Sequence, residues 1–161
     1  GGLVGPQFAA LKTQLGPLLN GVVNYEFYVP DLGGKFPFLE QFLGKYQARA
    51  AKEGVDPLGF YLPPYAYAMM QVLDQAITAT KGLDQAKLAD YIHKSTFDTY
   101  VGKVAFAKNG EWAVSRVMMT QYHGISGNSV DQFKKPGRLT VLSPKEYKTG
   151  DLKAPYHENK K

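Results

Sequence analysis

The sequence predicts an α/β chain that is rich in helix and has a β-hairpin near residues 103–122. Three segments between residues 37 and 94 carry apolar residues at helical spacing and are bounded by proline, glycine or aspartate. Residues 21–29 alternate in the manner of a strand. Val104 and Phe106 lead to Asn109-Gly110, the residue pair that a tight hairpin turn favours.

The elements follow one another in a clear order. Pro6 suits a first helical position, which predicts a short helix over residues 6–15. The strand at 21–29 follows, and Pro37 and Gly54 bound the first long helix. Pro63-Pro64 opens the second, which ends at Gly82, and Asp84 caps a third. Residues 113–122 form the second strand of the hairpin, and residues 138–142 form a last strand.

The helical stripes are too wide for these strands to cover. The two main stripes are Leu39, Phe42, Leu43 and Tyr46, and Met69, Val72, Leu73 and Ala76. We therefore expect part of the sheet to lie in sequence outside this chain. Self-association of the isolated chain is the other way to cover the stripes.

The net positive charge of the chain is concentrated near its C-terminus. The net charge is +5, and residues 131–161 hold eight Lys or Arg against four acids. Proline and glycine interrupt this region, and no basic stripe alternates with stacking aromatic residues. We therefore interpret this region as a solvated basic C-terminus and not as a polyanion site, and we expect no nucleic-acid partner.

The residues needed for common catalytic and metal chemistry are absent or scattered. The chain has no cysteine, and His93, His123 and His157 stand about 30 residues apart, so we expect no metal or cofactor. Glu26, Asp31 and Glu40 are interpreted as separate surface carboxylates. The chain is predicted not to be an enzyme. No apolar run approaches the roughly 20 residues of a membrane span.

Three tyrosines surround the predicted start of the helix at Pro63-Pro64. Tyr61, Tyr65 and Tyr67 offer flat apolar faces with a hydroxyl at the edge. A helix N-terminus favours an anionic ligand, which predicts a cleft lined by at least one of them. The alternative is ordinary packing, with Tyr65 in the core.

Several segments, in order, resemble the solute-binding proteins of ABC importers for branched-chain amino acids and amides. They are Asn20-Gly21-Val22-Val23 with Tyr28-Val29-Pro30, Phe42-Leu43-x-x-Tyr46 followed by Gly54-Val55-Asp56-Pro57, Tyr65 to Ala76, and Thr99-x-x-Gly102-x-x-x-Phe106-x-x-x-Gly110. Together they cover most of residues 5–145.

The resemblance implies the C-terminal fragment of a periplasmic binding protein-like fold of type I, in which two α/β lobes close over a ligand. Residues 1–30 would end the second lobe, and 31–96 would be the helical portion of the first. Residues 97–145 would hold the hairpin and the strands that cross the hinge, and 146–161 a polar tail. No signal peptide is visible in the chain, which begins without Met; this is expected of the interior of a longer protein.

The resemblance also implies a function and a site. The protein would be a periplasmic receptor that captures a small, carboxylated solute, such as an amino acid, amide or aromatic acid, and delivers it to an ABC permease in the membrane. The ligand-facing aromatic of the family matches Tyr61, with Leu62 as the neighbouring alternative, and Tyr65 lies beside them. The loop that often holds an acid for the ammonium group of the ligand falls at Gly2 and Leu3, where no acid stands. This argues against an α-amino acid.

Two alternatives from other classes stay open. A regulatory sensor with the same lobes would signal to a protein partner, and an attached output domain would identify it. An enzyme would need catalytic residues outside this chain, because fold alone does not exclude one.

Overall fold

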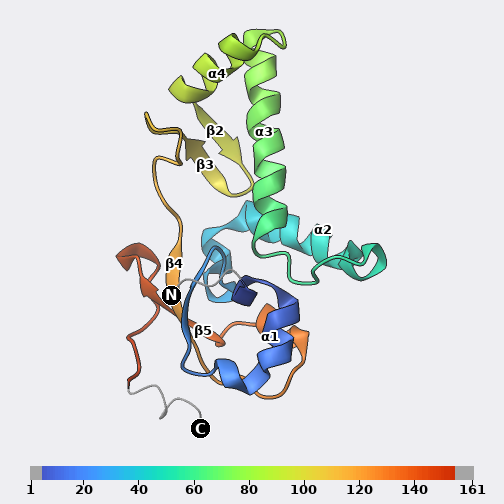
Figure 1. The fold of residues 1–161 in the computed structure, drawn as a ribbon, viewed down its shortest axis with the longest axis vertical. Coiled ribbons are helices and arrows are strands. Elements are labelled where there is room, and N and C mark those ends of the chain that lie inside the picture. Colours follow the sequence, from blue (N-terminus) through green and yellow to red (C-terminus); the bar gives the residue numbers. More distant parts are fainter. Residues whose placement is uncertain (1–4, 155–161) are drawn as a thin grey trace.

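Two hydrophobic clusters organise the described residues, which are 5–154 of a computed structural model. The first cluster lies in what we call the sheet unit, built from α1 (Ala9–Leu15), β1 (Val23–Glu26), β4 (Met118–Tyr122), β5 (Leu139–Ser143) and the start of α2 (Pro37–Glu53). The second lies in the hairpin unit, built from α3 (Leu62–Thr80), α4 (Gln85–Lys94), β2 (Thr96–Thr99) and β3 (Gly102–Ala105). The hairpin unit stands above the sheet unit in Figure 1, and the chain before β4 runs between them.

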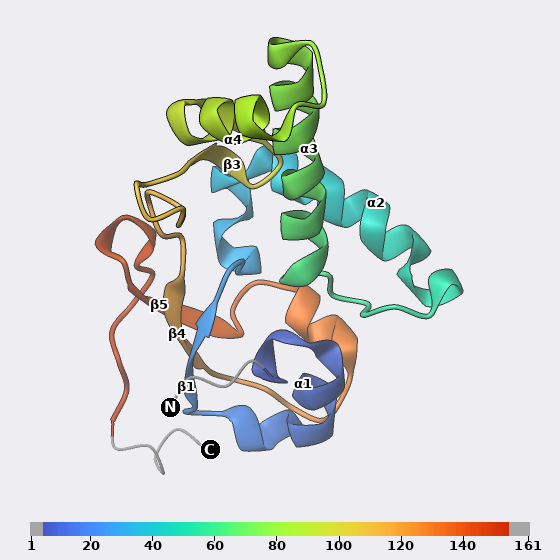
Figure 2. The same cartoon turned by 45° about the horizontal axis from the view of Figure 1, so that its top comes forward.

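The sheet unit contains a three-stranded antiparallel sheet in the order β1-β4-β5. Tyr25 lies opposite Met119, and Thr120 lies opposite Val141, with a bulge between Met119 and Thr120. Figure 2 shows β1 and β4 side by side. The sheet therefore joins segments that are about a hundred residues apart in sequence, and this places the early and late parts of the chain in one core.

In the hairpin unit, β2 and β3 pair antiparallel, with Phe97 opposite Val104. Two glutamine side chains of α3 hold this hairpin against the helix. The Gln75 amide donates to the Asp98 carbonyl at 2.9 Å, and the Gln71 amide oxygen accepts from the Tyr100 N–H at 2.9 Å. These bonds satisfy backbone groups that the short ladder leaves free.

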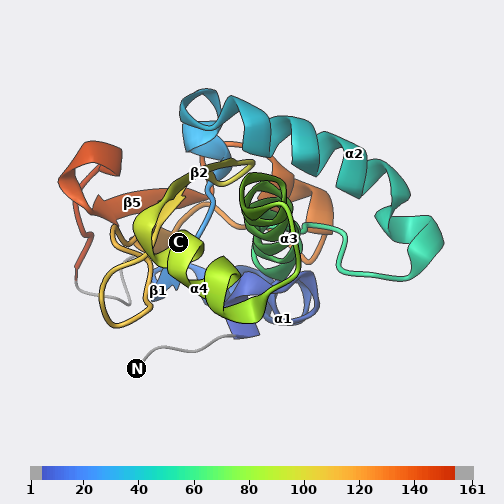
Figure 3. The ribbon, with the colours of Figure 1, turned by 90° about the horizontal axis from the view of Figure 1, so that it is seen from above.

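The three long helices follow the predicted boundaries closely. Pro37 opens α2, and Gly54 ends it in the left-handed region with φ +66°. The Asp84 carboxylate caps α4 by accepting from the Lys87 N–H at 3.0 Å. The second helix differs slightly, because α3 begins at Leu62 and ends where Lys81, not Gly82, takes a positive φ. Figure 3 shows α2 passing beside α3.

The predictions for the first short helix and for the strands need correction. The expected short helix at 6–15 divides into a 3-10 turn (Gly5–Gln7) and α1, and the strand expected over 21–29 is only Val23–Glu26. The Asn109-Gly110 turn forms, with the Gly110 N–H donating to the Ala107 carbonyl, but its ladder is a single bridge between Phe106 and Trp112. The main hairpin is formed by β2 and β3, one strand earlier in the chain than the predicted one. Residues 118–122 pair with β1 and β5 instead, because the sheet unit supplies their partners.

The two predicted apolar stripes differ in how far this chain covers them. Leu39 and Leu43 of α2 are buried in the sheet unit, so that stripe is mostly covered. On α3, Val72 and Ala76 are buried by the hairpin, while Met69 is 72% exposed and Met70 62% exposed. Of the two stripes, the one on α3 is therefore the less covered, on the side that carries Met69 and Leu73.

We predict that the purified chain of residues 1–161 associates through this side of α3. Apolar patches beyond a few hundred Å² are rare on soluble monomers, so light scattering at micromolar concentration should give a mass above that of a monomer. Replacing Met69 and Leu73 together by Glu should shift the mass toward the monomer. Leu83→Glu, at an exposed position beyond the end of α3, is the control. A compact monomer with a sharp unfolding transition would contradict the prediction.

Candidate functional site

An aromatic cluster lies where the sheet unit meets the hairpin unit. The Tyr61 ring stacks on Phe27 with centroids 4.8 Å apart, and its edge meets Phe8 at 5.7 Å. Phe8 directly precedes α1, Phe27 follows β1, and Tyr61 precedes α3. The predicted ligand-facing tyrosine therefore sits at the junction of the two units, half-buried between rings from the sheet unit.

Tyr65 extends this cluster into the hairpin unit. Its ring meets Phe27 at 5.4 Å and Trp112 at 6.0 Å, both edge to face. Burial raises the pKa of the Tyr65 phenol to about 12, so it stays protonated at neutral pH. Tyr65 also lines an apolar groove of about 380 Å³, together with Met69, Leu73 and Trp112. Tyr65 thus belongs both to the packing and to a groove.

The other predicted site residues do not join the cluster. Leu62 is 53% exposed. Tyr67 packs instead on Phe42 at 5.5 Å and Tyr100 at 5.3 Å, between α2 and the hairpin. Gly2 and Leu3 lie outside the described residues. Of the three tyrosines, the structure brings Tyr61 and Tyr65 together and leaves Tyr67 apart.

The start of α3 is a poorer anion site than the sequence indicates. The helix begins at Leu62, so Pro63 and Pro64 occupy its second and third positions. A helix N-terminus attracts anions through its free N–H groups, and proline has none. The residues that signal the start of the helix also remove two of the donors that an anion would need.

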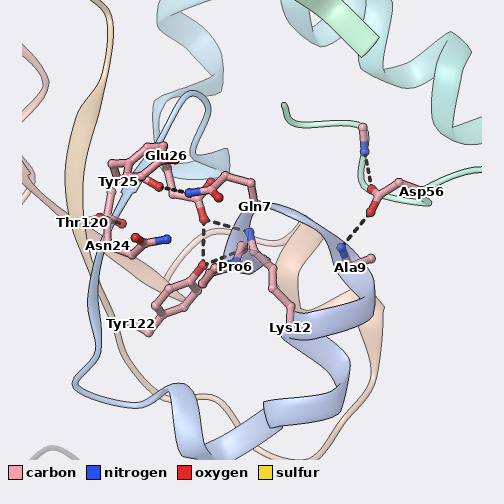
Figure 4. A network of polar contacts seen from close by, with 11 residues as sticks. Pro6, Gln7, Ala9, Lys12, Asn24, Tyr25, Glu26, Asp56, Thr120 and Tyr122 are labelled. Atoms are coloured by element: carbon pink, nitrogen blue, oxygen red, sulfur yellow. Dashed lines mark hydrogen bonds and ion pairs between the residues drawn. The ribbon is translucent and has the colours of Figure 1, made fainter. Parts of the chain in front are cut away.

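Asp56 positions the loop that carries Tyr61. One carboxylate oxygen accepts from the Ala9 N–H at 2.7 Å, at the start of α1, and the other accepts from the N–H groups of Leu58 and Gly59. These bonds fasten the α2–α3 loop to α1, as the right side of Figure 4 shows. The contact between Phe8 and Tyr61 follows from this link.

A buried ion pair lies beneath the cluster, in the core of the sheet unit (Figure 4). The Lys12 ammonium is 3.0 Å from Glu26 Oε1, and both side chains are only 1% exposed. The Tyr122 hydroxyl donates to the same Glu26 oxygen at 2.7 Å. Burial, followed by the Glu26 charge, raises the Tyr122 pKa well above 10 and keeps its proton in place. Lys12 also lies within 6 Å of three ring centroids, those of Phe60, Tyr122 and Phe133.

This network decides which face of the predicted strand is buried. The alternation at 22–29 places Asn24 and Glu26 on one face, and the structure turns that face toward the core, leaving Val23 40% exposed. The Gln7 amide donates to the Tyr25 carbonyl, and the Thr120 hydroxyl donates to the Asn24 carbonyl at 3.0 Å. Glu26 is therefore not a surface carboxylate, because its buried partner Lys12 makes an inward position favourable.

The remaining predicted carboxylates lie apart from this network. Asp31 accepts from the Gly137 N–H at 2.9 Å, and a Cβ on Gly33 would meet the Glu40 carboxylate, which places Glu40 beside that loop. Within residues 5–154, no group of three or more His, Cys, Asp or Glu comes together in a way that could hold a metal ion. No helix in that range has the length and apolar character to span a membrane.

The fold matches part of a periplasmic binding protein-like fold. Among solved structures, it is similar to a leucine-binding protein from Thermotoga maritima, with a TM-score of 0.56 and 21% sequence identity. The match covers 84% of this chain and 33% of that protein, so the chain spans about a third of its length. No known family profile and no curated protein sequence matches the chain.

We predict that Glu26→Gln destabilises the protein by about 3–5 kcal/mol, because it leaves the Lys12 charge buried without its partner. Chemical denaturation followed by tyrosine and tryptophan fluorescence measures the loss. Glu53→Gln, which removes the exposed partner of Arg49, should change stability by less than about 0.5 kcal/mol. Adding Lys12→Met to Glu26→Gln should restore part of the stability. Equal stability of Glu26→Gln and the parent chain would refute the role of this pair.

Proposed function

We propose that the natural protein is an extracytoplasmic solute-binding receptor that hands its solute to an ABC permease in the membrane. The solute is small and carboxylated, such as an amino acid, amide or aromatic acid. The observation that carries the proposal is the likeness to a leucine-binding protein over 84% of this chain. Such a receptor works by differential affinity between two conformations and needs no catalytic group.

The proposed receptor has two lobes. We assign residues 1–30 to the end of the second lobe, 31–96 to the helical portion of the first, and 97–145 to the hairpin and the strands that cross the hinge. We also assign residues 146–161 to a polar tail. The second cluster lies within residues 65–112, whereas the first joins residues from all three assigned segments, so the boundary between the clusters does not coincide with the assigned lobe boundary. The pairing of β4 with β1 supports a late return of the chain to the second lobe.

Tyr61 is the residue we assign to the ligand cleft, with Tyr65 beside it. Its ring bridges α1 of the sheet unit and the start of α3, and a cleft between lobes would open at that place. Leu62 is the alternative at the same position, and its 53% exposure leaves it available. We also propose Gly2 and Leu3 for the site; both lie outside the described residues.

A thermal-shift screen of the natural full-length protein tests the function. The solutes are amino acids, their amides and aromatic carboxylic acids, each at millimolar concentration. Binding to the folded state alone raises the melting temperature, since a ligand at 100 times its Kd adds about 2.7 kcal/mol. Stabilisation by one chemical class supports the receptor. A protein that no solute of the three classes stabilises would not be the receptor proposed.

We predict that Tyr61→Ala weakens the binding of the solute found in that screen by about 1–3 kcal/mol, the loss expected for an aromatic side chain at the centre of a site. Isothermal titration calorimetry on the natural protein gives the affinity. Tyr67→Ala is the matched control, because Tyr67 packs on Phe42 and Tyr100 outside the cluster. Unchanged affinity in Tyr61→Ala would remove Tyr61 from the site.

A further inference from the structure

Arg116 lies between the two units and contacts an aromatic ring from each. Its guanidinium carbon is 4.2 Å from the Phe36 ring centroid and 5.8 Å from that of Trp112. Phe36 packs against the core of the sheet unit, and Trp112 packs against the core of the hairpin unit. A single cation thus spans the junction, held by stacking on both sides.

One edge of this guanidinium is buried and has no partner. The Nε and Nη2 atoms of Arg116 are both closed off from solvent, and neither makes a hydrogen bond within residues 5–154. These two nitrogens form the side of the guanidinium whose parallel N–H bonds match the two oxygens of a carboxylate. The buried edge is therefore the one suited to a bidentate carboxylate.

The Tyr65 hydroxyl is a second buried group without a partner. Tyr65 and Arg116 contact the same Trp112 ring. Their charges also interact: the Arg116 charge lowers the pKa of Tyr65, and Tyr65 raises the pKa of Arg116. Burial lowers the Arg116 pKa, and the phenols of Tyr65 and Tyr147 oppose that change only in part. No carboxylate forms an ion pair with Arg116 in the described part of the chain, so stacking on two rings is what stabilises its buried charge there, and no anion pairs with it.

We propose that the Nε–Nη2 edge of Arg116 and the Tyr65 hydroxyl form a carboxylate-binding site at the junction of the two units. The edge is closed in this conformation, and movement of the units apart would open it. The carboxylate comes from one of two sources with the same chemistry. It belongs either to a dissolved organic acid or to an Asp or Glu side chain of the natural protein outside residues 5–154. If it belongs to the captured solute, the site specifies the solute class, and in that case the inference rests on the proposed function.

The test follows the Arg116 Nε–H resonance of the ¹⁵N-labelled natural protein by NMR, assigned by its loss in Arg116→Gln. Sodium acetate is the probe, and acetamide and sodium chloride are the controls. A dissolved carboxylate predicts a shift with acetate alone. Arg116→Lys keeps the charge but lacks both the fork and this resonance, so its acetate affinity is read from the melting temperature and should be weakened about tenfold or more. Tyr65→Phe should weaken it less. Arg49→Lys, at an exposed position, should leave it unchanged.

The other source gives a different result. A carboxylate of the protein itself predicts an Arg116 Nε–H resonance already displaced downfield without acetate and insensitive to it, and Arg116→Lys should lower the unfolding midpoint. A resonance at the position of an exposed arginine, unmoved by acetate, would overturn the proposal. A response to acetate in a protein that binds no solute of the screen would leave this site standing and the receptor function refuted. Solute binding in a protein whose Arg116 resonance stays at the position of an exposed arginine, unmoved by acetate, would do the reverse.

Discussion

The buried Lys12–Glu26 pair is the constraint around which the sheet unit is arranged. Two charges that are 1% exposed require close partners, and the 3.0 Å contact, the Tyr122 hydroxyl and three surrounding rings supply them. Lys12 comes from α1, Glu26 from β1 and Tyr122 from β4, so meeting this requirement brings three elements into one register. A slip of one residue in β1 would point Glu26 to solvent and leave Lys12 unpaired.

The position of the aromatic cluster depends on that register. Phe27 follows Glu26 directly, so once Glu26 faces the core, the next side chain points to the opposite face, toward Tyr61. Asp56 holds Tyr61 near Phe27 and Phe8, because it fastens the α2–α3 loop to the start of α1. The candidate site thus follows from the Lys12–Glu26 ion pair and from the Asp56 hydrogen bonds, and none of these three residues is part of the site.

The sequence predicts the helices of this chain better than its strands. Proline, glycine and aspartate mark the ends of α2 and α4, because helix ends are set by local chemistry. Alternation predicts the strand at 21–29 but cannot say which face is buried, since that depends on Lys12 and on Tyr122, almost a hundred residues away. Tyr61 is predicted from its place before the prolines. Arg116 is missed, because nothing next to it in sequence shows that Phe36 will stack on it.

The junction between the units differs in kind from their cores. The cores interlock aliphatic and aromatic side chains, which pack at nearly crystalline density and resist displacement. The contacts between Tyr61 and Phe8, between Tyr61 and Phe27, and between Arg116 and Phe36 instead place flat groups against one another. Stacked faces can slide or separate without leaving cavities inside either core. This junction is also where the aromatic rings around Tyr61 and the Arg116 guanidinium edge, which has no partner in the described part of the chain, lie near one another.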